Sequence, residues 1–258
     1  MKIAVCLKPV PSTTAEIRPA ADGKSVQLSG VEMLVNPYDE YALEAALKLR
    51  EAFPGSTILA VTAGGDDAAK CVLHAFSLGA DAALQIKAPG IGARGAALAI
   101  AAALKEFAPD IVLCGRQAID DDQWELPGAL GERLDMPHVS AVQALSVGAD
   151  GKKLTAKRRF NRDEQTVEST LPAVVSCDKG LNEPRSPTLK GRLDAKKKTA
   201  SIKTPADLGL DTALLQSALH VQTVSPPPQK TPGKTITLPP PDAAREIVRW
   251  LREEAKAV

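Results

Sequence analysis

The first half of the chain alternates short apolar runs with longer amphipathic segments, and this alternation constrains the fold more than any other feature. Apolar runs at residues 2–8, 57–62, 82–87 and 110–114 predict strands, and the segments at 37–53, 66–79 and 93–107 predict helices. Strands that alternate with helices form a mostly parallel sheet with helices on both faces. We therefore predict an α/β fold with a three-layer, Rossmann-like arrangement.

The helix predicted at 37–53 has the clearest boundaries. Asn36 stands where an N-cap is expected, Pro37 suits the first helical position, and Asp39 lies near the positive end of the helix dipole. Leu43 and Leu47 recur at helical spacing, and a Pro-Gly pair at 54–55 ends the segment.

The pattern changes after residue 137. Segments 139–147, 153–159 and 166–170 predict an antiparallel hairpin extension, and residues 171–177 predict a strand that returns to the sheet. We expect one α/β domain over 1–177 and an extended arm over 178–258, which loses periodicity and ends in a helix at about 242–256. Such an arm lies either against this domain or against another chain, and the second place makes it a partner-binding arm.

Composition excludes several classes of function. Lys and Arg total 32 against 31 acidic residues, so no strong field attracts nucleic acid, and few aromatic residues accompany the basic clusters. No apolar run reaches about 18 residues, so we predict no membrane span. The four cysteines lack CxxC spacing and favour free thiols in a reducing compartment, which indicates a cytoplasmic protein. The three histidines are far apart in sequence and predict no metal site.

Catalytic motifs are scarce. Residues 62–67, TAGGDD, are similar to the SGGxDS loop of ATP-pyrophosphatases but lack its serines, and a simple turn capped by Asp66 or Asp67 is the alternative. The chain contains no G-x-x-x-x-G-K-[ST] and no G-x-S-x-G, and no G-x-G-x-x-G stands directly after the first strand. An enzyme with its own catalytic residues is therefore not predicted.

The loop GRQAIDDDQWELPGALGE, residues 115–132, follows a predicted strand at the sheet edge where ligands bind in α/β folds. It carries three consecutive acids, residues 120–122, and no Lys. A capping box from Asp122 to Glu125 would put Pro127 at the fifth helical position, whereas a helix that begins at Pro127 has Leu126 as a poor cap. Either arrangement leaves backbone N–H groups for a ligand.

Four segments resemble the β subunit of electron transfer flavoprotein, in the family order: NPYDEYALE at 36–44, GRQAID at 115–120, LPAVV at 171–175 and LNEPR at 181–185. The resemblance implies a subunit that pairs with a larger α subunit, which mainly holds the redox FAD. It implies AMP as a structural ligand of the β subunit, or a second FAD together with NADH chemistry in a bifurcating branch. It also implies donors such as acyl-CoA dehydrogenases and a quinone reductase as acceptor.

The resemblance also implies site residues. Asp121 favours the non-bifurcating form, Tyr38 is expected near the flavin, and the docking segment for a dehydrogenase includes Leu189, Lys190 and Arg192. The chain departs from the family at residues 123–128, where bulky and anionic side chains replace small phosphate-binding ones. The implied nucleotide-binding residues are Cys6, Asn36, Pro37, Tyr38, Asp39, Ala60, Ala63, Gly115, Gln117, Ala118, Ile119, Asp120, Asp122, Gln123, Trp124, Glu125 and Leu126.

Overall fold

A computed structural model describes residues 1–217, 219–229, 233 and 235–257. These residues form a nine-stranded central sheet in the order β11-β10-β9-β12-β8-β1-β6-β7-β13. Its middle consists of parallel strands that are buried: β1 (Lys2–Cys6), β6 (Thr57–Gly64), β7 (Ala82–Lys87), β8 (Ile111–Gly115) and β12 (Ala173–Cys177).

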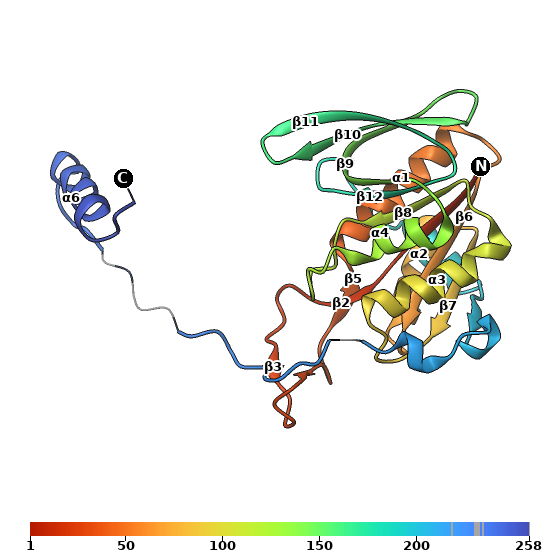
Figure 1. The fold of residues 1–258 in the computed structure, drawn as a ribbon, viewed down its shortest axis with the longest axis horizontal. Helices are drawn as coiled ribbons and strands as arrows, with labels where there is room; N and C mark the ends of the chain where they lie inside the picture. Colours follow the sequence, from red (N-terminus) through yellow and green to blue (C-terminus); the bar gives the residue numbers. More distant parts are fainter. Residues whose placement is uncertain (218, 230–232, 234, 258) are drawn as a thin grey trace.

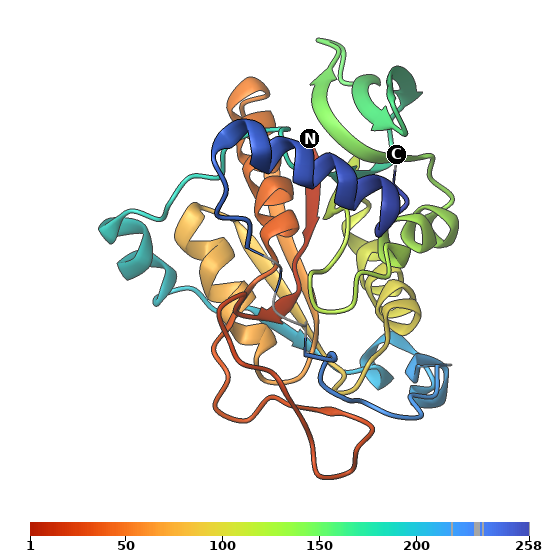
Figure 2. The ribbon, with the colours of Figure 1, turned by 90° about the vertical axis from the view of Figure 1, so that its left-hand side faces the viewer.

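Two pairs of helices cover the two faces of this sheet. One face carries α1 (Pro37–Ala52) and α2 (Ala68–Leu78), and the other carries α3 (Ala93–Phe107) and α4 (Glu125–Leu134). Figure 2 shows the sheet between the two layers. Because neighbouring strand residues point to opposite faces, Ile3 and Val5 pack toward α1 and α2, while Ala4 and Cys6 pack toward α3 and α4. The predicted three-layer α/β fold is confirmed.

Antiparallel elements complete the first part of the chain. The predicted hairpin extension is present as β9 (His138–Val147), β10 (Lys153–Phe160) and β11 (Asp163–Thr170), with β9 parallel to β12. Two small ribbons lie between β1 and α1. They pair β2 (Pro9–Pro11) with β5 (Met33–Val35), and β3 (Arg18–Pro19) with β4 (Val26–Gln27).

The segment after β12 lies in two different places. Residues 178–217 pack on the α/β domain: α5 (Leu189–Ala195) lies on α2, β13 (Ser201–Lys203) pairs with β7, and the 3-10 turns η1 (Ala206–Leu208) and η2 (Thr212–Leu215) lie on α3. The contact with α3 is close, because a Cβ at Gly95 would lie 2.2 Å from the Leu215 carbonyl oxygen.

The last helix, α6 (Pro240–Glu253), contains no buried residue and lies apart from the sheet in Figure 1. Its apolar side chains Ile247, Val248 and Trp250 are all exposed. Within the described ranges, every helix is too short or too polar to cross a bilayer.

The strand order places a topological switch point between β1 and β8. The chain leaves β1 toward β6 and β7 on one side, whereas β8 lies on the other side of β1. Connections that leave two adjacent parallel strands in opposite directions open a crevice at the carboxyl ends of those strands. The candidate site occupies this crevice.

Candidate functional site

A cavity of about 150 Å³ opens at the carboxyl ends of β1 and β8. Its polar side is formed by the residues after β1, the start of α1 and the loop after β8. Its apolar side includes Ile91, which precedes α3, and Ala96 and Ile100, which lie within α3. The first turn of α4 closes a further side with Glu125, Leu126 and Pro127.

Asp39 ties three of these segments together. Its carboxylate is buried and accepts hydrogen bonds from the backbone N–H of Lys8 (2.7 Å), the backbone N–H of Gly115 (3.1 Å) and the Asn36 side-chain amide (2.9 Å). Gly115 permits this approach, because a Cβ there would lie 2.3 Å from the Asp39 Oδ1 atom and 2.7 Å from the Tyr38 carbonyl carbon. Burial raises the pKa of Asp39 to about 7, although the three donors favour its charged form.

Asn36 acts differently from the prediction. It precedes α1, and Pro37 begins the helix as expected, but the Asn36 side chain makes no cap hydrogen bond. Instead its amide donates to the Gln117 carbonyl oxygen (2.8 Å), and its oxygen accepts from the Ile119 backbone N–H (3.2 Å). Asn36 is therefore the N-cap residue, as predicted, but its side chain holds the loop after β8 and does not cap the helix. The N-cap residue of α2 is Asp67, one of the two predicted, and its side chain likewise makes no cap hydrogen bond.

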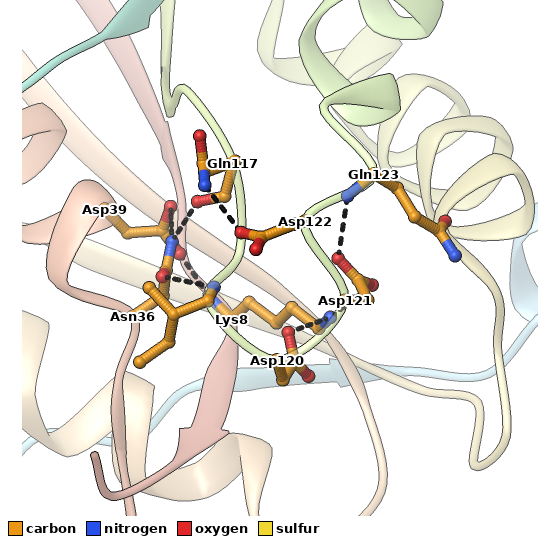
Figure 3. A network of polar contacts seen from close by, with 9 residues as sticks. Lys8, Asn36, Asp39, Gln117, Asp120, Asp121, Asp122 and Gln123 are labelled. Atoms are coloured by element: carbon orange, nitrogen blue, oxygen red, sulfur yellow. Dashed lines mark hydrogen bonds and ion pairs between the residues drawn. The ribbon is translucent and has the colours of Figure 1, made fainter. Parts of the chain in front are cut away.

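A lysine that is distant in sequence pairs with two of the three acids of the loop. Lys8 Nζ lies 2.8 Å from a carboxylate oxygen of Asp120 and 2.8 Å from one of Asp121, as Figure 3 shows. Burial alone would lower the pKa of Lys8, but the hydrogen bonds and charges of the two aspartates raise it above its ordinary value. Asp122 instead accepts a hydrogen bond from the Gln117 side chain.

The start of α4 follows neither predicted alternative. The helix begins at Glu125, and its N-cap position is Trp124, which has the left-handed φ of 58°. Pro127 is therefore the third helical residue, where no intrahelical N–H bond is lost. The backbone N–H groups of Glu125 and Leu126 have no intrahelical acceptor, and both residues line the cavity.

Arg116 connects the loop to the sheet. Its guanidinium pairs with the buried carboxylate of Asp178 (2.9 Å), donates to the Gln117 side-chain oxygen (2.9 Å) and to the Tyr38 hydroxyl (3.3 Å). It also lies 5.1 Å from the centre of the Tyr38 ring and 4.1 Å from that of the Trp124 ring. The guanidinium is thus held in place from several sides.

The structure brings most of the predicted nucleotide-binding residues together. Ala60 packs in the core under α1 and α2, Ile119 and Asp120 hold the loop through Asn36 and Lys8, and Pro37 and Tyr38 begin α1. These five and Asp122 do not line the cavity. Those that do are Cys6, Asn36, Asp39, Ala63, Gly115, Gln117, Ala118, Gln123, Trp124, Glu125 and Leu126.

Several lining residues were not in the predicted set. Lys8 and Arg116 each follow a strand at the switch point within two residues, and this position is a signal that would have found them. The apolar wall from α3 has no comparable signal, because small apolar residues are common in any helix. The added lining residues are Leu7, Lys8, Ile91, Gly92, Ala93, Ala96, Ile100, Arg116, Asp121 and Pro127.

The buried acidic and thiol groups at this end of the sheet are held by hydrogen bonds or kept protonated. Both oxygens of Asp39 are engaged by donors. Burial raises the pKa of the Cys177 thiol, and contact with Cys6 together with burial raises that of Cys114, so both remain thiols. Among the described residues no cluster of His, Cys, Asp and Glu is arranged to hold a metal ion.

The predicted docking residues lie elsewhere. Leu189, at the start of α5, exposes 76% of its surface, and Lys190 and Arg192 lie beside it on the same helix. Thr188 caps this helix by accepting a hydrogen bond from Gly191 N–H (3.0 Å). None of the three residues lines the cavity.

Comparison with known proteins gives a consistent result. The family model described as Electron transfer flavoprotein domain matches residues 25–208. Proteins named electron transfer flavoprotein subunit beta are similar to the chain: 34% identical in Syntrophomonas wolfei (99% of this chain, 98% of the relative), 35% in Bacillus subtilis (90% and 91%) and 33% in Homo sapiens (98% and 97%). With its fold and its rim motifs, the chain belongs to the family of electron transfer flavoprotein β subunits.

Proposed function

We propose that the chain is one half of a heterodimeric electron carrier. It pairs with an α subunit, and the pair accepts electrons from dehydrogenases of the acyl-CoA type and passes them to a quinone reductase. Family membership and the names of the relatives support the carrier role. The chain has no catalytic step of its own in this proposal, and its buried free cysteines suit a reducing compartment such as the cytoplasm.

We propose that AMP occupies the cavity at the switch point as a structural ligand. One observation carries this proposal: the two segments that bear the family motifs, 36–39 and 115–126, meet at this cavity. The apolar wall of Ile91, Ala96 and Ile100 can cover an adenine base, whereas the Asp121 and Glu125 side chains, which also line the cavity, disfavour an anion. The free N–H groups of Glu125 and Leu126 can donate to phosphate at the positive end of α4.

The redox FAD belongs mainly to the α subunit in this proposal, and it supplies the electron-carrying chemistry. This chain contributes Tyr38 near the flavin, with its hydroxyl fixed by the guanidinium of Arg116 (3.3 Å). The arm over 178–258 binds the α subunit through its distal part. The exposed apolar side chains of α6 support this role, because such a set on a helix marks a partner surface. Residues 218, 230–232, 234 and 258 of the arm lie outside the described structure.

A bifurcating subunit with a second FAD is the alternative occupant of the same cavity. Asp121 favours AMP, because the three acids at 120–122 resemble the non-bifurcating form of the family. Its ion pair with Lys8 holds this acidic loop in place. The test is mass spectrometry of small molecules released from the native heterodimer. We expect one FAD and one AMP per heterodimer. Two FADs would establish the alternative, and FAD without any β-bound nucleotide would contradict the AMP site.

Leu189 is proposed as the apolar anchor for a donor dehydrogenase, with Lys190 and Arg192 adding electrostatic steering. We expect Leu189→Ala to slow electron delivery from the dehydrogenase about tenfold while flavin content stays unchanged. The control is Leu28→Ala, which removes a leucine that is also exposed, on the loop after β4. Equal rates for the two variants across candidate dehydrogenases would remove Leu189 from the docking surface.

A further inference from the structure

Trp124 is held in an unusual conformation at the rim of the cavity. Its φ of 58° is left-handed, which is rare for a bulky side chain and persists only where the surroundings determine it. The side chain belongs to neither hydrophobic core, and half of the residue surface (50%) is exposed. Core packing therefore does not explain why a tryptophan stands here.

A fixed guanidinium covers one face of the Trp124 ring. Arg116 lies 4.1 Å from the ring centre, within the range of a cation–π interaction. Arg116 is itself anchored by the buried Asp178 carboxylate (2.9 Å) and by the Gln117 side chain (2.9 Å). The ring is therefore oriented from behind by a network that reaches back to the end of β12.

Trp124 keeps half of its surface exposed, so part of the residue is open to a ligand. Trp124 lines the cavity, and no other cation or aromatic ring among the described residues contacts it. The cavity's apolar residues Ile91, Ala96 and Ile100 come from a different element, α3 and the segment before it. A flat apolar ring with a preset orientation and exposed surface at a cavity is suited to stacking.

We propose that Trp124 stacks on the planar heteroaromatic ring of the cavity's ligand and so determines its specificity. The inference rests on the proposed function, in which that ring is the adenine base of AMP. Arg116 is the positioning residue of this arrangement. It orients the indole ring of Trp124, and the ring contacts the base. The ligand class is thus a purine nucleotide or nucleoside, recognised through its base.

Calorimetric titration of the nucleotide-depleted heterodimer tests the stack, with AMP and adenosine as probes. The variants are Trp124→Leu, which keeps apolar bulk without a π face, and Trp124→Phe, which keeps the π face. Both carry the same positive φ, so backbone strain is matched. We expect Trp124→Leu to weaken both probes about tenfold, and Trp124→Phe to stay within about threefold of the parent protein.

A spectroscopic measurement complements the titration. The chain contains two tryptophans, Trp124 and Trp250, so labelling it alone with 5-fluorotryptophan gives two ¹⁹F resonances in a complex with unlabelled α subunit. We expect AMP to shift the Trp124 resonance, which Trp124→Phe identifies by its loss.

The outcomes separate the two proposals. If the parent protein binds AMP, if Trp124→Leu keeps the parent's affinity for AMP, and if AMP does not shift the Trp124 resonance, the stack is overturned. The nucleotide site then stands. Weaker AMP binding with unchanged adenosine binding also overturns the stack, because Trp124 would then act at the phosphate. A parent protein that binds neither AMP nor FAD in this cavity overturns the proposed function itself.

Discussion

The loop after β8 and the terminal helix α6 differ in where their contacts lie. The loop is polar, and its side chains are held by residues far away in sequence: Lys8 binds Asp120 and Asp121, and Asp178 binds Arg116. Helix α6 has apolar and charged residues on separate faces, a clear helical pattern that the loop lacks, yet no residue of α6 is buried. Local pattern strength is therefore a poor guide to whether a segment is held within its own chain.

The difference indicates two kinds of constraint on one sequence. Residues of the loop contact other residues of the same chain, so their substitution should alter the free energy of unfolding. In the proposed heterodimer, residues of α6 contact the α subunit, so their substitution should alter assembly. Four substitutions test this division, in decreasing order of their expected effect on the stability of the free chain.

Gly115→Ala should have the largest effect. The new Cβ would lie 2.3 Å from the Asp39 Oδ1 atom and 2.7 Å from the Tyr38 carbonyl carbon, so the end of β8 and the start of α1 must move apart. We expect a loss of more than about 4 kcal/mol in the free energy of urea unfolding. The control is Gly65→Ala, whose Cβ meets nothing closer than 4.0 Å. Similar losses for the two variants would show that the rim is not tightly packed.

Asp39 should make stability depend on pH. Its pKa is about 7 in the fold, against an ordinary value of 3.8, because burial penalises the charge. Between these values the folded chain keeps a proton that the unfolded chain has released, so stability falls as pH rises from about 4 to about 7. The fall amounts to at most about 4 kcal/mol and levels off above pH 7.

The variant Asp39→Asn should lack this slope, as measured by urea unfolding at a series of pH values. It should also be less stable at every pH, since its NH₂ group would face backbone donors. Asp66→Asn, whose carboxylate is almost fully exposed, serves as the control. A slope that survives in Asp39→Asn would assign the pH dependence to another group.

Lys8→Met should cost about 1 kcal/mol or less. The two ion pairs of Lys8 are partly exposed, so solvent screens them, and the remaining cost is repulsion among Asp120, Asp121 and Asp122. The effect should shrink as salt concentration rises. Lys87→Met, which removes an ion pair to the exposed Asp66, should change nothing measurable. A salt-independent loss at Lys8 would indicate packing rather than charge.

Trp250→Ala should leave the unfolding free energy of the isolated chain within about 0.5 kcal/mol of the parent, because α6 buries no residue in this chain. The same substitution should weaken co-purification with the α subunit. The matched control is Arg245→Ala on the same helix, at a position where no apolar contact is lost. Destabilisation of the isolated chain by Trp250→Ala would place α6 on its own domain.

Much of the fold could be predicted from periodicity. The helix from Pro37 follows from apolar residues at helical spacing, and the strand at Ala173–Cys177 follows from a short, mostly apolar run that is buried on both faces. The returning strand β13 could not be predicted, since three residues carry no period and its position depends on the exposed edge of β7.

The site was predictable in its location but less so in its contacts. The rim follows from strand ends, and the motifs of the family point to the same residues. The start of α4 could not be predicted because the left-handed conformation of Trp124 depends on its contact with Arg116. The role of Asn36 could not be predicted because Gln117 and Ile119 compete with the helix for its side chain. Both are tertiary interactions that override a local preference.

The two edge strands of the nine-stranded sheet affect whether the chain associates with copies of itself. Open strand edges recruit other strands, and aggregation follows. At one end lies β13, only three residues long, and at the other lies β11 with Asp163, Glu164 and Glu168 exposed along it. Short length and repelling charge both discourage edge-to-edge pairing. A newly made chain that has yet to meet its companion is thereby protected at both margins.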